Sequence, residues 1–343
     1  MACCKDAGRP CEGRKRTVGT MTESKAVFVA DLAAGDRIDD FFVLAEKNMA
    51  HKRDGNPFLN VTIADKSGRI RGVVWDDVPR IAAAAQIGDV VRVSATVGEY
   101  RGALQLVIKS VAAVADGQAA PDDFLPASGR DADQMFDRLK AAMDTLKSPY
   151  LQALIQALWD DPDLVDRFKR APAAKKMHHA YIGGLLEHTL SMVLLADKIA
   201  GHYSGVDREV LMVGAVVHDI GKLRELSYRT SIDYTNEGRL LSHITIGIEM
   251  VSATIAAIDG FPTELADLIK HMIVSHHGSR EFGSPEPPKT IEAVLLNYID
   301  EIDSRVNAIR EFMAADEADP SWTAYHRLLE RQFFKGGPTT TGV

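Results

Sequence analysis

The sequence predicts a multidomain chain in which a small all-β barrel is followed by an all-α helical bundle. Its 343 residues exceed one ordinary domain, and a hydrophobic content of 46% against 26% charged residues provides ample core material. Residues 27–114 contain short β-branched runs separated by turn signals, whereas residues 134–334 repeat apolar side chains every three or four positions. The first pattern is typical of strands and the second of helices.

Residues 1–26 are predicted to be a disordered leader. They are polar and basic and lack the apolar stretch of a signal peptide. All three cysteines of the chain lie in this segment, so a disulfide framework is not expected, which fits a reducing cytoplasm. No apolar run approaches the ~20 residues of a membrane-spanning helix. We therefore expect a cytoplasmic protein without a membrane segment.

Five strands are expected in the first domain, with a short helical piece at 78–85 after the third. The strands cover residues 41–52, 57–65, 68–76, 89–100 and 103–114, and clusters of Gly, Asp, Asn and Pro separate several of them. Five strands with one such helix are the components of an OB-fold barrel. The run PFLNVTIADKSGRIRGVVWDD (57–77) also resembles the second and third strands of OB-folds that bind single-stranded nucleic acid.

The charge of the barrel favours a nucleic-acid ligand, although the chain as a whole is acidic with a net charge of −8. From Glu46 to Arg71 there are six Lys or Arg against three Asp or Glu. We expect aromatic rings to stack on bases and basic side chains to contact the backbone of single-stranded RNA or DNA. The candidates are Phe58, Trp75 and Tyr100 for stacking, and Lys47, Lys52, Arg53 and Arg71 for the backbone. Trp75 fits the barrel core equally well, because two valines precede it.

Residues 115–133 are rich in Ala, Asp, Pro and Gly and are predicted to link the two domains. The helical domain follows at 134–334, and residues 335–343 are predicted to be a disordered tail. Apolar spacing predicts helices at 134–147, 150–159, 183–200, 209–222, 243–258, 264–277 and 291–313.

Histidine and aspartate residues lie on the apolar faces of several of these helices. Residues 211–217 are apolar on all sides, so this helix is expected to be buried, and it ends in His218 and Asp219. A buried carboxylate is costly unless it is paired or bound to a metal. A lone histidine on an apolar face is more often a hydrogen-bonded core residue, but that explanation does not fit the whole set well. The set is His188, His218, Asp219, His243, His276, His277 and Asp300, with Asp303 as an alternative to Asp300. Such nitrogen and oxygen ligands suit Mn, Fe, Ni, Zn or Mg.

The order of these residues resembles the H…HD…D signature of the HD phosphohydrolases. Along the chain, the signature consists of His188, then His218 and Asp219, then Asp300. HDIGK (218–222) matches the metal motif of that family directly. The three further histidines of the set are similar to those of the binuclear form seen in HD-GYP phosphodiesterases and YhaM-type exoribonucleases.

Together with the preceding OB-fold, the pattern from about residue 27 to 335 is most similar to the YhaM-like 3′-to-5′ exoribonuclease family. Two departures separate it from the HD-GYP phosphodiesterases. LRELSYRT (223–230) stands in place of the GYP-type segment, and Gly184 stands in place of a glutamate. A third metal and specificity for cyclic dinucleotides are therefore not expected.

The resemblance implies two divalent metal ions, with Mn favoured over Fe, Co, Ni or Mg. One ion would be bound by His188, His218, Asp219 and Asp300, and the other by His243, His276 and His277, with Asp219 bridging. Two ions ~3.5–4 Å apart can clamp a phosphodiester for in-line attack. Lys222 is expected to act beside the catalytic Asp219 by neutralising charge on the phosphoryl oxygens. An exposed lysine at a helix end is the alternative for Lys222.

Lys176, His178 and His179 precede the first ligand helix and are candidates for contact with substrate phosphates, or else solvated loop residues. The function expected is 3′-to-5′ hydrolysis of single-stranded RNA or DNA by a metal-dependent exoribonuclease or exonuclease. One alternative is a nucleotide or cyclic-nucleotide phosphohydrolase with a regulatory barrel. Another is a nucleic-acid-binding protein whose metal is only structural. The sequence leaves open a homo-oligomer and the choice between RNA and DNA.

Overall fold

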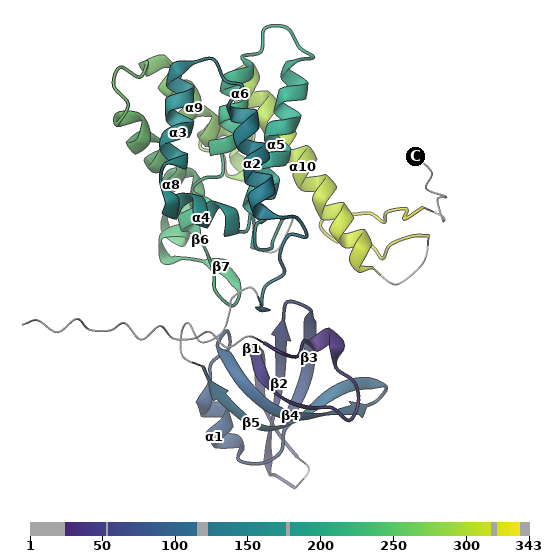
Figure 1. The fold of residues 1–343 in the computed structure, drawn as a ribbon. Helices are drawn as coiled ribbons and strands as arrows, with labels where there is room; N and C mark the ends of the chain where they lie inside the picture. Colours follow the sequence, from purple (N-terminus) through teal and green to yellow (C-terminus); the bar gives the residue numbers. More distant parts are fainter. Residues whose placement is uncertain (1–24, 53, 115–122, 176–178, 317–320, 337–343) are drawn as a thin grey trace, which may run out of the picture.

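The computed structural model describes residues 25–52, 54–114, 123–175, 179–316 and 321–336. These residues form a β-barrel and a helical domain, as the sequence predicts (Figure 1). The predicted leader up to residue 24, the end of the predicted tail, and Arg53, Lys176 and His178 lie outside the described residues. In the part of the chain that the structure describes, no helix has the length and apolarity needed to cross a membrane.

The barrel closes five strands in the order β1-β2-β3-β5-β4, and this confirms the OB-fold. The strands are β1 (Arg37–His51), β2 (Pro57–Asp65), β3 (Gly68–Val74), β4 (Val90–Tyr100) and β5 (Ala103–Ala113). β3 pairs with β5 in parallel, and every other neighbouring pair is antiparallel. The expected helix, α1 (Val78–Ala84), follows β3 in sequence, and the short turn η1 (Val29–Asp31) precedes β1.

Alternation along β2 explains why this segment forms a barrel strand. Leu59, Val61 and Ile63 are buried in the barrel core, whereas Phe58 and Asn60 occupy the alternate positions on the outer face. A strand with one apolar and one polar face can close a barrel and still present side chains to a ligand outside it. The predicted contact residue Phe58 lies on this outer face of β2.

The second domain is built from helices and one small hairpin. Its elements are α2 (Ala132–Met143), α3 (Pro149–Trp159), α4 (Pro162–Arg170), α5 (Gly184–Ala200), α6 (Arg208–Val217), α7 (Lys222–Glu225), β6 (Leu226–Tyr228), β7 (Ile232–Tyr234), α8 (Asn236–Ala256), α9 (Thr263–Ser275), η3 (Arg280–Phe282) and α10 (Ile291–Ala315). α4 and the β6–β7 hairpin were not predicted from the sequence, and the helix predicted at 209–222 ends at Val217 in the structure.

α6 is the buried central helix of this domain. Every residue from Val210 to Val217 is buried, so the helix has no solvent-facing side over this length. Gly214 allows α9 to pack closely, because a Cβ at this position would lie 2.6 Å from Cε of Met272. The helix ends at the residue before His218 and Asp219, which therefore lie inside the domain.

Among the described residues, the barrel is contacted both by the predicted linker and by a hairpin of the helical domain. Phe124, in the predicted linker, is buried in a small cluster with Phe41 and Val43 of β1. At the tip of the β6–β7 hairpin, the Thr230 hydroxyl donates a hydrogen bond of 2.8 Å to the carbonyl of Gly88, which precedes β4. Figure 1 shows this hairpin at the side of the helical domain that faces the barrel.

Candidate metal centre and substrate pocket

The seven candidate ligands come from five helices and meet at one place. α5 supplies His188, the residues after α6 supply His218 and Asp219, α8 supplies His243, the residues after α9 supply His276 and His277, and α10 supplies Asp300. All of them occupy positions that the apolar periodicity of the sequence directs inward. A set drawn from five separate segments is brought together only by the packing of the whole domain.

One half of the centre is formed by His188, His218 and Asp300. Nε2 of His188 lies 3.2 Å from Nε2 of His218 and 3.5 Å from Oδ1 of Asp300. Nε2 of His218 also lies 3.3 Å from Oδ2 of Asp219. These four residues match the four that the sequence analysis assigned to a first ion.

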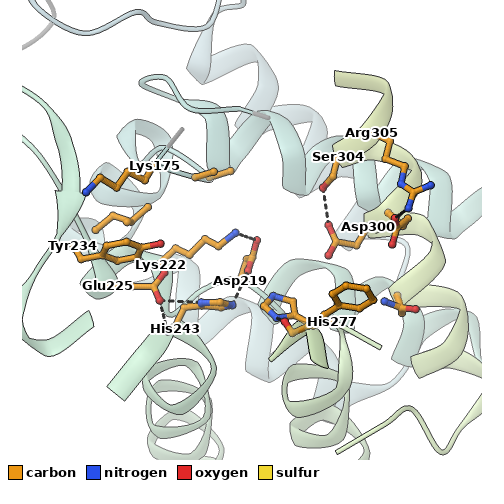
Figure 2. Close-up of a pocket in the computed structure, with 16 residues that line it drawn as sticks. Lys175, Asp219, Lys222, Glu225, Tyr234, His243, His277, Asp300, Ser304 and Arg305 are labelled. Atoms are coloured by element: carbon orange, nitrogen blue, oxygen red, sulfur yellow. Dashed lines mark hydrogen bonds and ion pairs between the residues drawn. The ribbon is translucent and has the colours of Figure 1, made fainter. Parts of the chain in front are cut away.

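The other half of the centre is formed by His243, His276 and His277. Their ligand atoms lie within 4.8 Å of one another. Oδ1 of Asp219 is 3.6 Å from Nε2 of His243 and 3.7 Å from Nε2 of His276. Asp219 thus directs one carboxylate oxygen to each half, and Figure 2 shows it between His243 and Asp300.

The histidine rings are held by hydrogen bonds at the nitrogen that points away from the centre. Nδ1 of His218, His276 and His277 donates to the carbonyls of Ala215, Ile273 and Phe282, at 3.0, 2.7 and 3.0 Å. Nδ1 of His243 lies 3.0 Å from Oε1 of Glu225, and Nδ1 of His188 lies 2.8 Å from Oδ2 of Asp303. A proton on Nδ1 leaves the lone pair on Nε2, which is the form that binds a metal.

The buried atoms of the centre fit a divalent cation. Oδ1 of Asp219, Nε2 of His243 and Nε2 of His276 are buried and have no hydrogen-bond partner among the described residues. Buried polar atoms are rarely left unsatisfied, and a cation would satisfy all three. Burial, together with the nearby His277 and His218 rings, holds the pKa of His276 well below its usual value, so this ring is neutral at pH 7.

Lys222 lies directly beside the shared carboxylate. Its Nζ is 2.6 Å from Oδ2 of Asp219. Burial alone would raise the pKa of Asp219, but Lys222 and His218 outweigh burial and hold it well below the usual range, so the carboxylate is ionised. The chain turns between α6 and α7 instead of continuing as one helix, and Gly221 at this turn allows α8 to pack closely against it. A Cβ at Gly221 would overlap the carbonyl of His243.

A strained residue positions His243. Ser242 has φ 61° inside α8, in the left-handed region that residues with a Cβ rarely adopt, and it divides the helix just before His243. Oε1 of Glu225 accepts hydrogen bonds from both the backbone N–H of His243, at 2.8 Å, and its Nδ1. The kink and the glutamate together direct Nε2 of His243 toward Asp219.

The structure shows which of Asp300 and Asp303 faces the centre. Asp300 lies on the ligand side of His188, whereas Oδ2 of Asp303 lies behind it, 2.8 Å from Nδ1 of His188 and 2.9 Å from Nε2 of His179. Oδ1 of Asp303 accepts from the Ser191 hydroxyl. Burial would raise the pKa of Asp303, but its hydrogen bonds with His179, His188 and Ser191 lower it below its usual value.

The position of His179 does not favour the substrate contact that the sequence analysis expected. The side chain is only 3% exposed, and Nδ1 lies 2.8 Å from the Tyr181 hydroxyl while Nε2 faces Asp303. His179 therefore supports the ligand His188 from behind. Sequence reasoning placed it in a loop before α5 and had no signal for the long-range partner on α10.

A pocket of about 780 Å³ opens onto the centre. Its lining includes five of the predicted residues, namely Asp219, Lys222, His243, His277 and Asp300. It also includes residues that sequence reasoning missed, among them Lys175, Tyr234, Phe282, Asn297 and Arg305. Asn297 has an evident structural part, since its Nδ2 donates to the carbonyl of His276 at 2.7 Å. In Figure 2, Lys175 and Tyr234 lie at one side of the pocket and Arg305 at the other.

On the barrel, the predicted aromatic residues lie at the surface. Trp75 is 42% exposed, and its ring stacks on Phe58 with centroids 5.2 Å apart. Nζ of Lys52 lies 4.8 Å from the centroid of Trp75. Trp75 is therefore outside the barrel core. Tyr100 and Arg71 line a groove of about 420 Å³ that is bordered by residues of all five strands.

Lys47 is the one described basic candidate that the structure places elsewhere. Its Nζ donates to the carbonyls of Ala82 and Ala85, at 2.8 and 2.7 Å, at the C-terminal end of α1. Carbonyls at the C-terminal end of a helix attract a cation, so Lys47 caps α1 and its ammonium group is directed there instead of toward a ligand.

Comparisons with known proteins agree with this arrangement. The family described as HD domain matches residues 185–305, and the family described as OB-fold nucleic acid binding domain matches residues 44–114. A helicase family matches residues 118–204, which end before His218. The 3′-5′ exoribonuclease YhaM of Geobacillus sp. (strain WCH70) is 32% identical over 302 residues, covering 88% of this chain and 92% of the relative. The chain belongs to the YhaM 3′-5′ exoribonuclease family.

A second YhaM, from Bacillus subtilis (strain 168), is also 32% identical and covers 88% of this chain and 95% of its own. Among solved structures, the second OB-fold domain of replication protein A from Methanococcus maripaludis is 16% identical and covers 28% of this chain and 98% of its own, with a TM-score of 0.22. In this member of the YhaM family, the HD match contains all seven candidate ligands, and the OB match contains the exposed aromatic residues of the barrel.

Proposed function

We propose that this chain is a metal-dependent 3′-to-5′ exoribonuclease that hydrolyses phosphodiester bonds of single-stranded RNA, with single-stranded DNA as a further substrate. The observation that carries the proposal is Asp219, whose two oxygens face two separate groups of histidines at the base of an open pocket. The names of the YhaM relatives supply the direction and the RNA substrate. The OB-fold supports a single-stranded ligand.

Two divalent ions, with manganese favoured, would be held by these residues. His188, His218 and Asp300 would bind one ion, His243, His276 and His277 the other, and Asp219 would contact both. When bound, the ions supply Lewis-acid polarisation of the phosphoryl oxygens and acidify water. A donor set of histidine nitrogens and aspartate oxygens suits manganese and iron.

The chain's own residues hold the site rigid and balance its charge. The hydrogen bonds at Nδ1 restrict each ring to one orientation, so the ligand atoms need little reorganisation when substrate enters. The Lys222 ammonium lines the pocket beside Asp219 and is placed to neutralise charge that develops on a phosphoryl oxygen. In the hydrolysis, water adds to phosphorus, one phosphorus–oxygen ester bond breaks, and the departing oxygen takes a proton.

The barrel would hold the strand while the pocket cleaves it. The stacked pair Phe58 and Trp75, with Lys52 beside it, offers a base platform and a cation for the backbone, and Arg71 and Tyr100 continue this surface. All cysteines lie within the first eleven residues, which supports a reducing, cytoplasmic setting.

The test uses single-stranded RNA and DNA labelled at either end. With manganese, the full-length protein should convert 5′-labelled RNA into a ladder of shortening products and release the 3′ label at once as a small product. Asp219→Asn should do neither. Hydrolysis of free nucleotides without any ladder would favour the nucleotide phosphohydrolase instead, and binding of RNA without hydrolysis would favour a structural metal site.

A further inference from the structure

The β6–β7 hairpin touches the barrel at one end and lines the substrate pocket at the other. At its tip, the Thr230 hydroxyl donates to the carbonyl of Gly88 in the barrel at 2.8 Å. At its base, Leu226 and Tyr234, which pair with each other across the hairpin, both line the pocket. A strand held by the barrel can follow this hairpin to the centre.

At the base of the hairpin, the aromatic ring of Tyr234 lies beside the cation of Lys175, which comes from the segment between α4 and α5. Tyr234 is 42% exposed, so its ring contributes little to the core. Nζ of Lys175 lies 5.5 Å from the centroid of the Tyr234 ring and also lines the pocket. A nucleotide offers a flat base and an anionic phosphate, and stacking on an exposed ring beside a lysine accommodates both.

The ion pair of Lys175 does not prevent contact with a phosphate. Nζ of Lys175 lies 2.6 Å from Oδ1 of Asp233, and both side chains are partly exposed, at 31% and 42%. Exposed pairs of this kind contribute little to stability, so turning Lys175 away from Asp233 costs little free energy. Asp233 also lies 3.3 Å from Arg239, so it keeps a cationic partner when Lys175 turns toward a phosphate.

The position of this pair relative to the centre fixes which nucleotide it would meet. In Figure 2, Lys175 and Tyr234 lie at one side of the pocket, Arg305 lies at the other, and Asp219 and Lys222 lie between them. The scissile phosphate is expected at Asp219. Because the hairpin side is the side that contacts the barrel, the body of the strand approaches from there, and the 3′-terminal nucleoside lies beyond the centre.

We propose that Tyr234 and Lys175 form a subsite for the penultimate nucleotide of the substrate, with Tyr234 stacking on its base and Lys175 contacting its phosphate. The strand reaches this subsite from the barrel along the β6–β7 hairpin. The inference rests on the proposed exoribonuclease function, because a penultimate nucleotide exists only in a polymeric substrate.

The test combines a variant of Tyr234 with removal of single bases from the RNA. Loss of one stacked base corresponds to about a 5- to 150-fold rise in KM. Three oligonucleotides are compared, with all bases present, with an abasic penultimate nucleotide, or with an abasic terminal nucleotide. For the wild-type protein the penultimate abasic RNA should show this rise. For Tyr234→Ala the intact RNA should already show it, and removing the penultimate base should add nothing.

The terminal abasic RNA and two further variants complete the design. The effects of Tyr234→Ala and of the missing terminal base should multiply, because they concern different nucleotides. Tyr234→Phe should retain the wild-type KM, since the ring is kept. Tyr203→Ala is the matched control, because Tyr203 is 55% exposed and precedes α6 at the end opposite to His218. Its KM should be unchanged.

The outcomes distinguish this inference from the function on which it rests. If the wild-type protein fails to shorten any RNA, the exoribonuclease function itself is wrong. If it shortens RNA but Tyr234→Ala behaves like Tyr203→Ala, the subsite is wrong and the function stands. If the effects of Tyr234→Ala and the missing penultimate base multiply while those of the missing terminal base do not, Tyr234 contacts the terminal nucleotide and the path along the hairpin is refuted.

Discussion

Replacing Asp303 by asparagine tests whether this residue stabilises the metal centre through its hydrogen bond with Nδ1 of His188. Oδ2 of Asp303 faces Nδ1 of His188 and Nε2 of His179, and Oδ1 accepts from Ser191. An amide group keeps the shape, and one oxygen can still accept from Ser191. Its NH₂ group would then face two ring nitrogens that now share a carboxylate oxygen. Asp303→Asn should therefore lose two hydrogen bonds to a charged acceptor.

The size of the loss follows from burial and charge. A hydrogen bond to a charged group contributes about 1.5–3 kcal/mol to stability. Because the two rings can take new tautomers and recover part of this, we expect the metal-free variant to be less stable by about 2–4 kcal/mol. Loss of a partner behind a metal-binding histidine also weakens metal affinity by about 10- to 100-fold.

Denaturant unfolding of the metal-free protein and a manganese titration measure the two effects. Asp300→Asn is the matched control, because Asp300 lies on the ligand side of His188 and accepts a hydrogen bond of 3.2 Å from the Ser304 hydroxyl. The control should lose metal affinity with little change in metal-free stability. The assigned roles are wrong if Asp303→Asn is as stable as the wild type without metal, or if Asp300→Asn is the less stable of the two variants. Asp303 would then not be the residue that supports His188, or Asp300 would not be the one that faces the metal.

Three further predictions concern the rest of the site. Lys222→Ala should keep both metals by elemental analysis and lower kcat on RNA by about 10²–10³-fold, since one electrostatic contact to the phosphoryl group is lost; an unchanged kcat would refute that role. Trp75→Ala should weaken binding of single-stranded RNA by about 1–3 kcal/mol in a fluorescence titration, whereas Trp322→Ala, a similarly exposed control on the C-terminal segment, should not. Gly221→Ala should abolish the fold around the centre, because its Cβ would overlap the carbonyl of His243, and a variant with wild-type circular dichroism and metal content would contradict this.

The barrel could be predicted from the sequence because its signals are local. β2 alternates buried and outward residues, and short turn sequences separate the strands. The two-residue periodicity and the turn residues therefore predict the same strand boundaries. The β6–β7 hairpin was missed because each strand has only three residues, too few to show a period. The close approach of α8 to Gly221 could not be predicted either, because it involves the carbonyl of His243, more than twenty positions away.

The candidate ligands were recognisable because each is a polar residue on an apolar helix. Their supporting partners were not, since Asp303 and His179 are 124 positions apart and meet only through packing. Asp300 and Asp303 lie one turn apart on α10, and spacing alone could not say which faces the centre. Tyr234 and Lys175 carry no sequence pattern, because a pocket wall is formed by tertiary structure.

The metal content of full-length protein and of Asp219→Ala tests the central claim most directly. Asp219 is placed in both halves of the centre, with Oδ2 toward His218 and Oδ1 toward His243 and His276. After manganese loading and removal of free ions, elemental analysis should find two ions per wild-type chain and close to none per Asp219→Ala chain, with helical content retained by circular dichroism. Two ions retained in Asp219→Ala, or one ion in the wild type, would contradict a binuclear centre that shares this carboxylate.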